Sequence, residues 1–183
     1  RSGELLIDVT SSLDLYGGGL SAAGANIRNC GDCLAQAGAS CRMKTATELV
    51  IDELREGADC LREGYGKLNR AVEECQVDED YVLMEKITNM INPMKASSIF
   101  LEDAGAAILT KESVDVIGQH LISCGEALLS LSATIGVLDE TNKDCTTSAQ
   151  RMVYASEQMI LAGNELIGGE KKEKPKGKSW IKG

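Results

Sequence analysis

The residues with the clearest potential for chemistry are cysteines, of which the chain has seven. Two of them form the motif Cys30-Gly-Asp-Cys33, a spacing found in structural zinc sites and in redox pairs. A structural zinc takes four ligands, usually as two close pairs, and the other cysteines are scattered singly along the sequence. A redox pair would need a strand–helix–strand context, which the surrounding sequence lacks. We therefore predict no metal site, and the odd number of cysteines favours thiols in a reducing compartment.

Other groups that act in catalysis are present but not in catalytic patterns. His120 is the only histidine, so a di-iron bundle, which needs Glu-x-x-His on two helices, is excluded. No nucleophile with an orienting partner is suggested near it. Acidic residues cluster at 53–56, 73–74 and 78–80, where solvated helix faces or connectors explain them. We predict no catalytic residue, no cofactor and no enzymatic activity.

The elements that carry these residues are predicted to be long helices. Of the 183 residues, 43% are hydrophobic but only 3% aromatic, so the core must be built from aliphatic and small side chains. Only two residues are proline, which disfavours a turn-rich β-protein. No apolar run is long enough to predict a transmembrane span.

Apolar residues recur at alternating intervals of three and four, which is the pattern of one helix face. The first such stripe continues past three consecutive glycines, Gly17–Gly19, so we predict a helix there that is bent or broken near them. The stripe is Leu6, Val9, Leu13, Tyr16, Leu20, Ala23, Ile27, Cys30, Leu34 and Ala37.

Four more stripes follow, at 50–75, 83–108, 114–138 and 145–166. Pro93 is expected to kink or split the third, and Gly168-Gly169 to end the fifth. The predicted connectors, near 39–44, 76–79, 109–112 and 138–141, are short, and short connectors make neighbouring helices antiparallel. The predicted fold class is all-α, an antiparallel up-and-down bundle of four or five long helices. This bundle is assigned to residues 1–169 and a basic tail to 170–183.

The tail is the one feature outside the predicted core to which we assign a binding role. The chain has a formal net charge of −9, yet residues 170–183 contain six lysines and two glutamates. An acidic body disfavours nucleic-acid binding, whereas a basic tail with an apolar anchor suits an anionic surface such as a membrane, an acidic polymer or another protein. The candidate residues are Lys171, Lys172, Lys174, Lys176, Lys178, Trp180 and Lys182.

Three stretches resemble the helical-bundle modules of talin rods, vinculin and α-catenin. They are LEDAGAAIL (101–109), LISCGEALLSLSATIGVL (121–138) and AQRMVYASEQMILAGNELI (149–167). The resemblance implies a helical scaffold without catalysis. Residues 114–138 are the nearest match to a vinculin-binding helix of talin, although Gln119, His120 and Gly125 depart from its pattern.

We therefore expect a non-enzymatic protein-interaction module, a cytoskeletal or cell-adhesion scaffold or adaptor in the cytoplasm. Its partner would be an amphipathic helix held in a groove between helices, or a filament such as actin. The alternative is a structural component of a larger filament or microtubule-based assembly, anchored by the basic tail. An enzyme or small-molecule carrier that uses the bundle interior is disfavoured, because no convergent set of polar residues is visible.

Overall fold

A computed structural model describes residues 18–43, 47–139, 141 and 143–172. These residues form five α-helices and no strand, so the all-α prediction is confirmed for the described part of the chain. The helices are α3 (Gly18–Met43), α4 (Thr47–Val77), α5 (Tyr81–Leu109), α6 (Val114–Gly136) and α7 (Lys143–Lys172).

Two of the helices begin at a capping side chain. The Asp80 carboxylate accepts a hydrogen bond from the Leu83 amide at 3.0 Å, and the Ser113 hydroxyl accepts one from the Val116 amide at 3.3 Å. Each cap satisfies an amide that has no partner inside its helix, which favours a helix start at that residue. The connectors that precede these two helices, residues 78–80 and 110–113, are short, so each helix lies beside the previous one.

Of the two outcomes expected at Pro93, a kink or a split, the structure excludes the split, because α5 runs unbroken from Tyr81 to Leu109 with the proline inside it. Burial of Met90 and Met94 on either side of the proline holds this segment in the core, which offsets the lost backbone hydrogen bond. Likewise, Gly168 and Gly169 do not end the last helix, which continues to Lys172. The part of the first stripe that precedes Gly18 lies outside the described residues.

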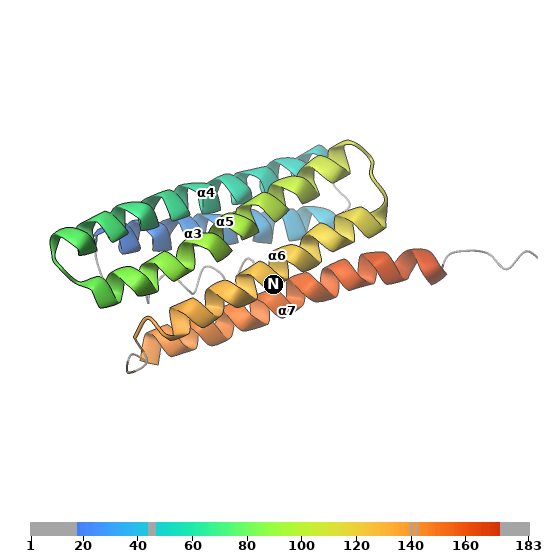
Figure 1. The fold of residues 1–183 in the computed structure, drawn as a ribbon. Coiled ribbons are helices and arrows are strands. Elements are labelled where there is room, and N and C mark those ends of the chain that lie inside the picture. Colours follow the sequence, from blue (N-terminus) through green and yellow to red (C-terminus); the bar gives the residue numbers. More distant parts are fainter. Residues whose placement is uncertain (1–17, 44–46, 140, 142, 173–183) are drawn as a thin grey trace, which may run out of the picture.

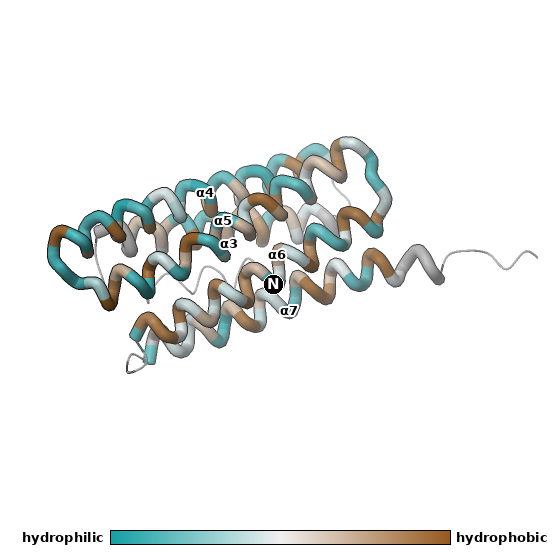
Figure 2. The backbone as a smooth tube through the Cα atoms, viewed as in Figure 1, coloured by the Kyte–Doolittle hydropathy of each residue, from teal (hydrophilic) through white to brown (hydrophobic). Residues whose placement is uncertain are grey.

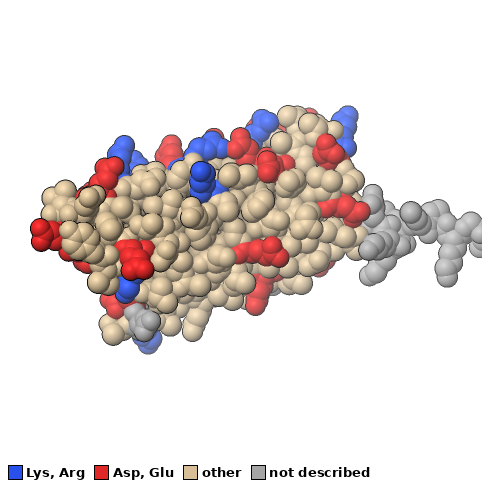
Figure 3. Space-filling model, in the orientation of Figure 1, with Lys and Arg blue, Asp and Glu red and all other residues tan. Residues whose placement is uncertain are grey.

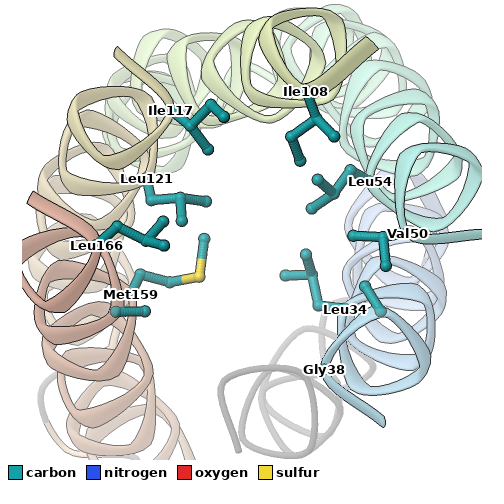
Figure 4. A pocket seen from close by; sticks show the side chains of 11 residues that line it. Leu34, Gly38, Val50, Leu54, Ile108, Ile117, Leu121, Met159 and Leu166 are labelled. Carbon is teal, nitrogen blue, oxygen red and sulfur yellow. The ribbon is translucent and has the colours of Figure 1, made fainter. Parts of the chain in front are cut away.

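The helices pack in chain order. The extensive contacts join α3 to α4, α4 to α5, α5 to α6 and α6 to α7. Figure 1 shows these neighbours lying side by side, with the α4–α5 connector at one end of the molecule and the α5–α6 connector at the other. In an end-on view the five helices form an arc that runs in chain order from α3 to α7 (Figure 4).

The core consists of the predicted stripes. Ile27 of α3, Leu61 of α4, Met94 of α5 and Leu131 of α6 are almost entirely buried, as is Met152 of α7. Small residues share these positions, which lets the helices approach closely but buries less apolar area per residue. The outer side of α4 carries many hydrophilic residues, whereas α6 and α7 are less polar along their length (Figure 2).

Glycines bring the backbones of α6 and α7 into direct contact. A Cβ atom added at Gly118 would lie 2.7 Å from the carbonyl oxygen of Gly163, and one added at Gly125 would lie 2.8 Å from that of Ser156. Real Cβ atoms do not approach backbone oxygens so closely, so no larger residue fits at these two positions. These mid-helix glycines therefore serve packing between helices, not flexibility.

Candidate functional site

One concave feature of the described residues is an apolar groove enclosed by the arc of helices. It has a volume of about 370 Å³, and all five helices contribute to its walls. Figure 4 shows the larger side chains pointing from the helices into this space. The groove is lined by Leu34, Ala37, Gly38, Val50, Leu54, Ile108, Ile117, Leu121, Met159, Ala162 and Leu166.

The groove is formed where predicted stripes are not fully covered. Val50, Ile108 and Ile117 are stripe residues, yet each is only partly buried. Leu166, the last residue of the fifth stripe, is 37% exposed. All four lie at the same end of the molecule, where α4 and α6 begin and where α5 and α7 approach their ends. The periodicity predicted that these four residues are buried in a core. In the structure they line a groove instead.

Gly38 leaves space on the α3 side of the groove. A Cβ atom added there would meet no heavy atom within 4 Å. Its neighbours along the wall, Leu34 and Ala37, are nevertheless buried at 8% and 5% exposure. The groove therefore has a packed floor and an open rim, a shape that suits an inserted apolar side chain better than a polar ligand.

A second cluster brings a thiol and two carboxylates together between α3 and α4. The Cys33 sulfur and the carboxylate oxygens of Glu53 and Glu56 all lie within 4.8 Å of one another. The thiols of Cys33 and Cys60 also share a hydrogen bond. Sequence reasoning treated these residues separately because they belong to different helices. The spacing of Glu53, Glu56 and Cys60 along one helix face was the available signal.

The electrostatics of this cluster keep the thiols protonated. Burial raises the pKa of Cys33 to about 12, and the Cys60 sulfur and the nearby Glu56 and Glu53 carboxylates add to the rise. Burial also raises the pKa of Cys60. Because the thiolate is the reactive form, these cysteines are poor nucleophiles at neutral pH. The three donor groups fall short of the four ligands that a structural zinc takes.

Two further cysteines, one on α3 and one on α6, are core residues. Cys30 and Cys124 are fully buried, and burial raises the pKa of Cys124 to about 12. The Cys124 thiol donates to the carbonyl oxygen of Ser97 at 3.8 Å, which ties α6 to α5. These two residues behave as small apolar side chains, as their positions on the stripes predict.

The other candidates from the sequence do not enter the groove. His120 is partly exposed, and its Nδ1 lies 3.9 Å from an Asp103 carboxylate oxygen, an ion pair only when the imidazole is protonated. On the face shown in Figure 3, most Lys and Arg side chains lie along the edge formed by α4, and acidic groups are scattered. Tail residues 173–183 lie outside the described part of the chain, and only the helical backbone of Lys171 and Lys172 is described.

Comparison of the chain with known proteins identifies no relative. No protein-family model, curated protein or solved structure matches the chain. Among the described helices, none has a stretch long and apolar enough to span a membrane. Fold and site together define the class only as an all-α protein whose helices surround an apolar groove.

Proposed function

We propose that this chain is a non-enzymatic protein-interaction module that accepts an amphipathic helix of a partner protein in the groove between α3 and α7. The observation that carries the proposal is the composition of the groove, since all eleven lining residues are apolar or glycine. Grooves of this kind between helices bind the apolar face of another helix, whose side chains at every third or fourth position enter them. None of these lining residues can titrate, which suits docking rather than proton transfer.

The arrangement of the helices supports this role. We infer that they run alternately up and down, because consecutive helices pack side by side and are joined by short connectors. An arc of helices whose extensive contacts join chain neighbours can hold a further helix between its two end helices. In this reading the chain acts as a cytoskeletal or adhesion-type scaffold or adaptor in the cytoplasm, in keeping with the resemblance to talin, vinculin and α-catenin modules.

The test uses a designed amphipathic helical peptide of about 18 residues with leucine at every third or fourth position, and a scrambled peptide of the same composition. Binding is measured by fluorescence anisotropy. Gly38→Trp should fill the groove from α3 and weaken binding of the amphipathic peptide at least tenfold. Gly66→Trp is the matched control, because this helical glycine also has no heavy atom within 4 Å of an added Cβ but lies beside Lys67 and Arg70, away from the groove. Equal binding by both variants would contradict the proposal.

The second candidate function is a structural component of a filament or microtubule-based assembly, anchored by the lysine-rich tail. Its support is the contrast between the tail, with six lysines, and a chain of net charge −9. Co-sedimentation with actin filaments and with microtubules separates the two candidates. Replacing Lys174, Lys176, Lys178 and Lys182 by Gln should abolish sedimentation if the tail is the anchor, whereas Gly38→Trp should abolish it if the groove is the contact.

A further inference from the structure

The groove of the described residues is open along the line between α3 and α7. Leu166 of α7 is 37% exposed on one rim, and Gly38 of α3 leaves free space on the other. Leaving an apolar surface of this kind in water is unfavourable. An occupant must present apolar side chains on one side and polar ones on the other, and it must reach the gap between the two end helices.

The sequence before α3 has the spacing of an amphipathic helix. Leu6, Val9, Leu13 and Tyr16 follow one another at intervals of three, four and three, which places them on one face of a helix. Glu4, Ser11 and Asp14 fall on the opposite side of that helix. Residues 4–16 are therefore a candidate amphipathic helix with one apolar face and a mixed opposite side that carries Glu4, Ser11 and Asp14.

The length of this segment brings its first residues near the groove. From the start of α3 at Gly18 to the groove residue Leu34 the helix rises by about 24 Å, at about 1.5 Å per residue. A helix over residues 4–16 is about 20 Å long by the same rise. If the chain reverses at Gly17, where glycine tolerates any backbone conformation, this helix runs back along α3 and brings Leu6 towards the groove.

We propose that residues 4–16 occupy the groove between α3 and α7 and compete there with the partner helix. The competition rests on the proposed function, whereas the occupancy rests only on the groove and on the sequence of the segment. Because the segment is tethered to α3, its effective concentration at the groove is high, on the order of millimolar for short linkers. A partner helix then binds only the fraction of molecules in which the segment has left, and its apparent affinity falls in proportion.

Hydrogen exchange of the full chain, followed by mass spectrometry, tests the occupancy. Amides of residues 5–16 should exchange at least tenfold more slowly than in a peptide of the same sequence. Leu166→Ser removes a groove wall and should abolish this protection. Leu161→Ser is the control, since Leu161 lies on the same helix, is 52% exposed and does not line the groove.

Three outcomes would overturn the inference. Residues 5–16 could exchange as fast as the free peptide, which would show that they are not held. Their protection could survive both Leu166→Ser and Gly38→Trp, which would place them elsewhere. It could also increase with protein concentration, which would identify a second copy of the chain as the occupant.

Substitutions within the segment test the competition. Leu6→Ser with Leu13→Ser removes the apolar face, and the anisotropy assay should then show at least tenfold tighter binding of the amphipathic peptide. Ile7→Ser with Leu15→Ser removes two apolar side chains from the other side of the helix and should leave affinity unchanged. Equal affinities in the two double variants would refute competition. If no variant binds the peptide, the proposed function fails, while hydrogen exchange still decides whether residues 4–16 occupy the groove.

Discussion

Two connectors each contain a residue with a left-handed backbone conformation. Glu79 has a φ of 58° and Lys111 a φ of 57°, values that are costly for residues with a side chain. Each follows the end of a helix, and the amide one residue later donates back into that helix, Asp80 to the Cys75 carbonyl at 2.9 Å and Glu112 to the Ala107 carbonyl at 2.9 Å. This is the helix-ending motif in which glycine is the usual residue.

Glycine at position 79 should therefore stabilise the protein. We expect Glu79→Gly to raise the free energy of unfolding by about 1 kcal/mol, because glycine adopts a positive φ without steric cost. Urea unfolding followed by circular dichroism measures the change. Asp78→Gly is the control, since Asp78 is the preceding exposed residue and does not have a positive φ, and it should give no gain. Equal effects of the two substitutions would show that Glu79 is not strained.

At the scale of elements, glycine has two different effects on the helices of this chain. Gly118 and Gly125 allow the backbones of α6 and α7 to touch, and an added Cβ would lie within 2.8 Å of an α7 carbonyl oxygen. Gly66 of α4 has no heavy atom within 4 Å of the same hypothetical atom. In the first case glycine is required by packing, whereas in the second it only lowers helix propensity.

The two kinds of glycine should respond oppositely to alanine. We expect Gly118→Ala to lower the free energy of unfolding by about 1–3 kcal/mol, because the helices must move apart. Gly66→Ala should raise it by about 1 kcal/mol, the usual gain of alanine over glycine in a helix interior. Thermal and urea unfolding measure both changes. Stabilisation by Gly118→Ala would mean that α6 and α7 are not in backbone contact there.

At the scale of the whole molecule, the packing is linear. Each helix has extensive contacts only with its neighbours in the chain, and α6 and α7 form the most extensive pair. A disturbance between α6 and α7 therefore reaches α5 more directly than it reaches α3. Proteins with this kind of local packing open in units rather than all at once under native conditions.

Hydrogen exchange should reveal these units. In Gly118→Ala, amides of α6 and α7 should exchange about tenfold faster than in the original chain, whereas those of α3 and α4 should change little. The comparison is made at neutral pH without denaturant, with Gly66→Ala as the variant that leaves the α6–α7 contact intact. An equal acceleration in all five helices would show that the protein opens as a single cooperative unit.

Periodicity alone determined the helices and the residues they bury. Spacings of three and four place Ile27, Leu61 and Leu131 inward in any packed arrangement, since a helix repeats every 3.6 residues whatever its neighbours are. The helix end predicted at Gly168-Gly169 was wrong, and Pro93 does not split α5, for the complementary reason. Local preferences for ending a helix are weak compared with the burial of the segment around them.

Only the tertiary structure decided which apolar residues form a groove. Ile117 and Leu131 lie on the same stripe of α6, yet the first lines an open space and the second is fully buried. The cluster of Cys33 with Glu53 and Glu56 likewise depends on how α3 faces α4. A stripe specifies which side of a helix avoids water, but not which other helix covers it, because that depends on how the five helices curve around one another.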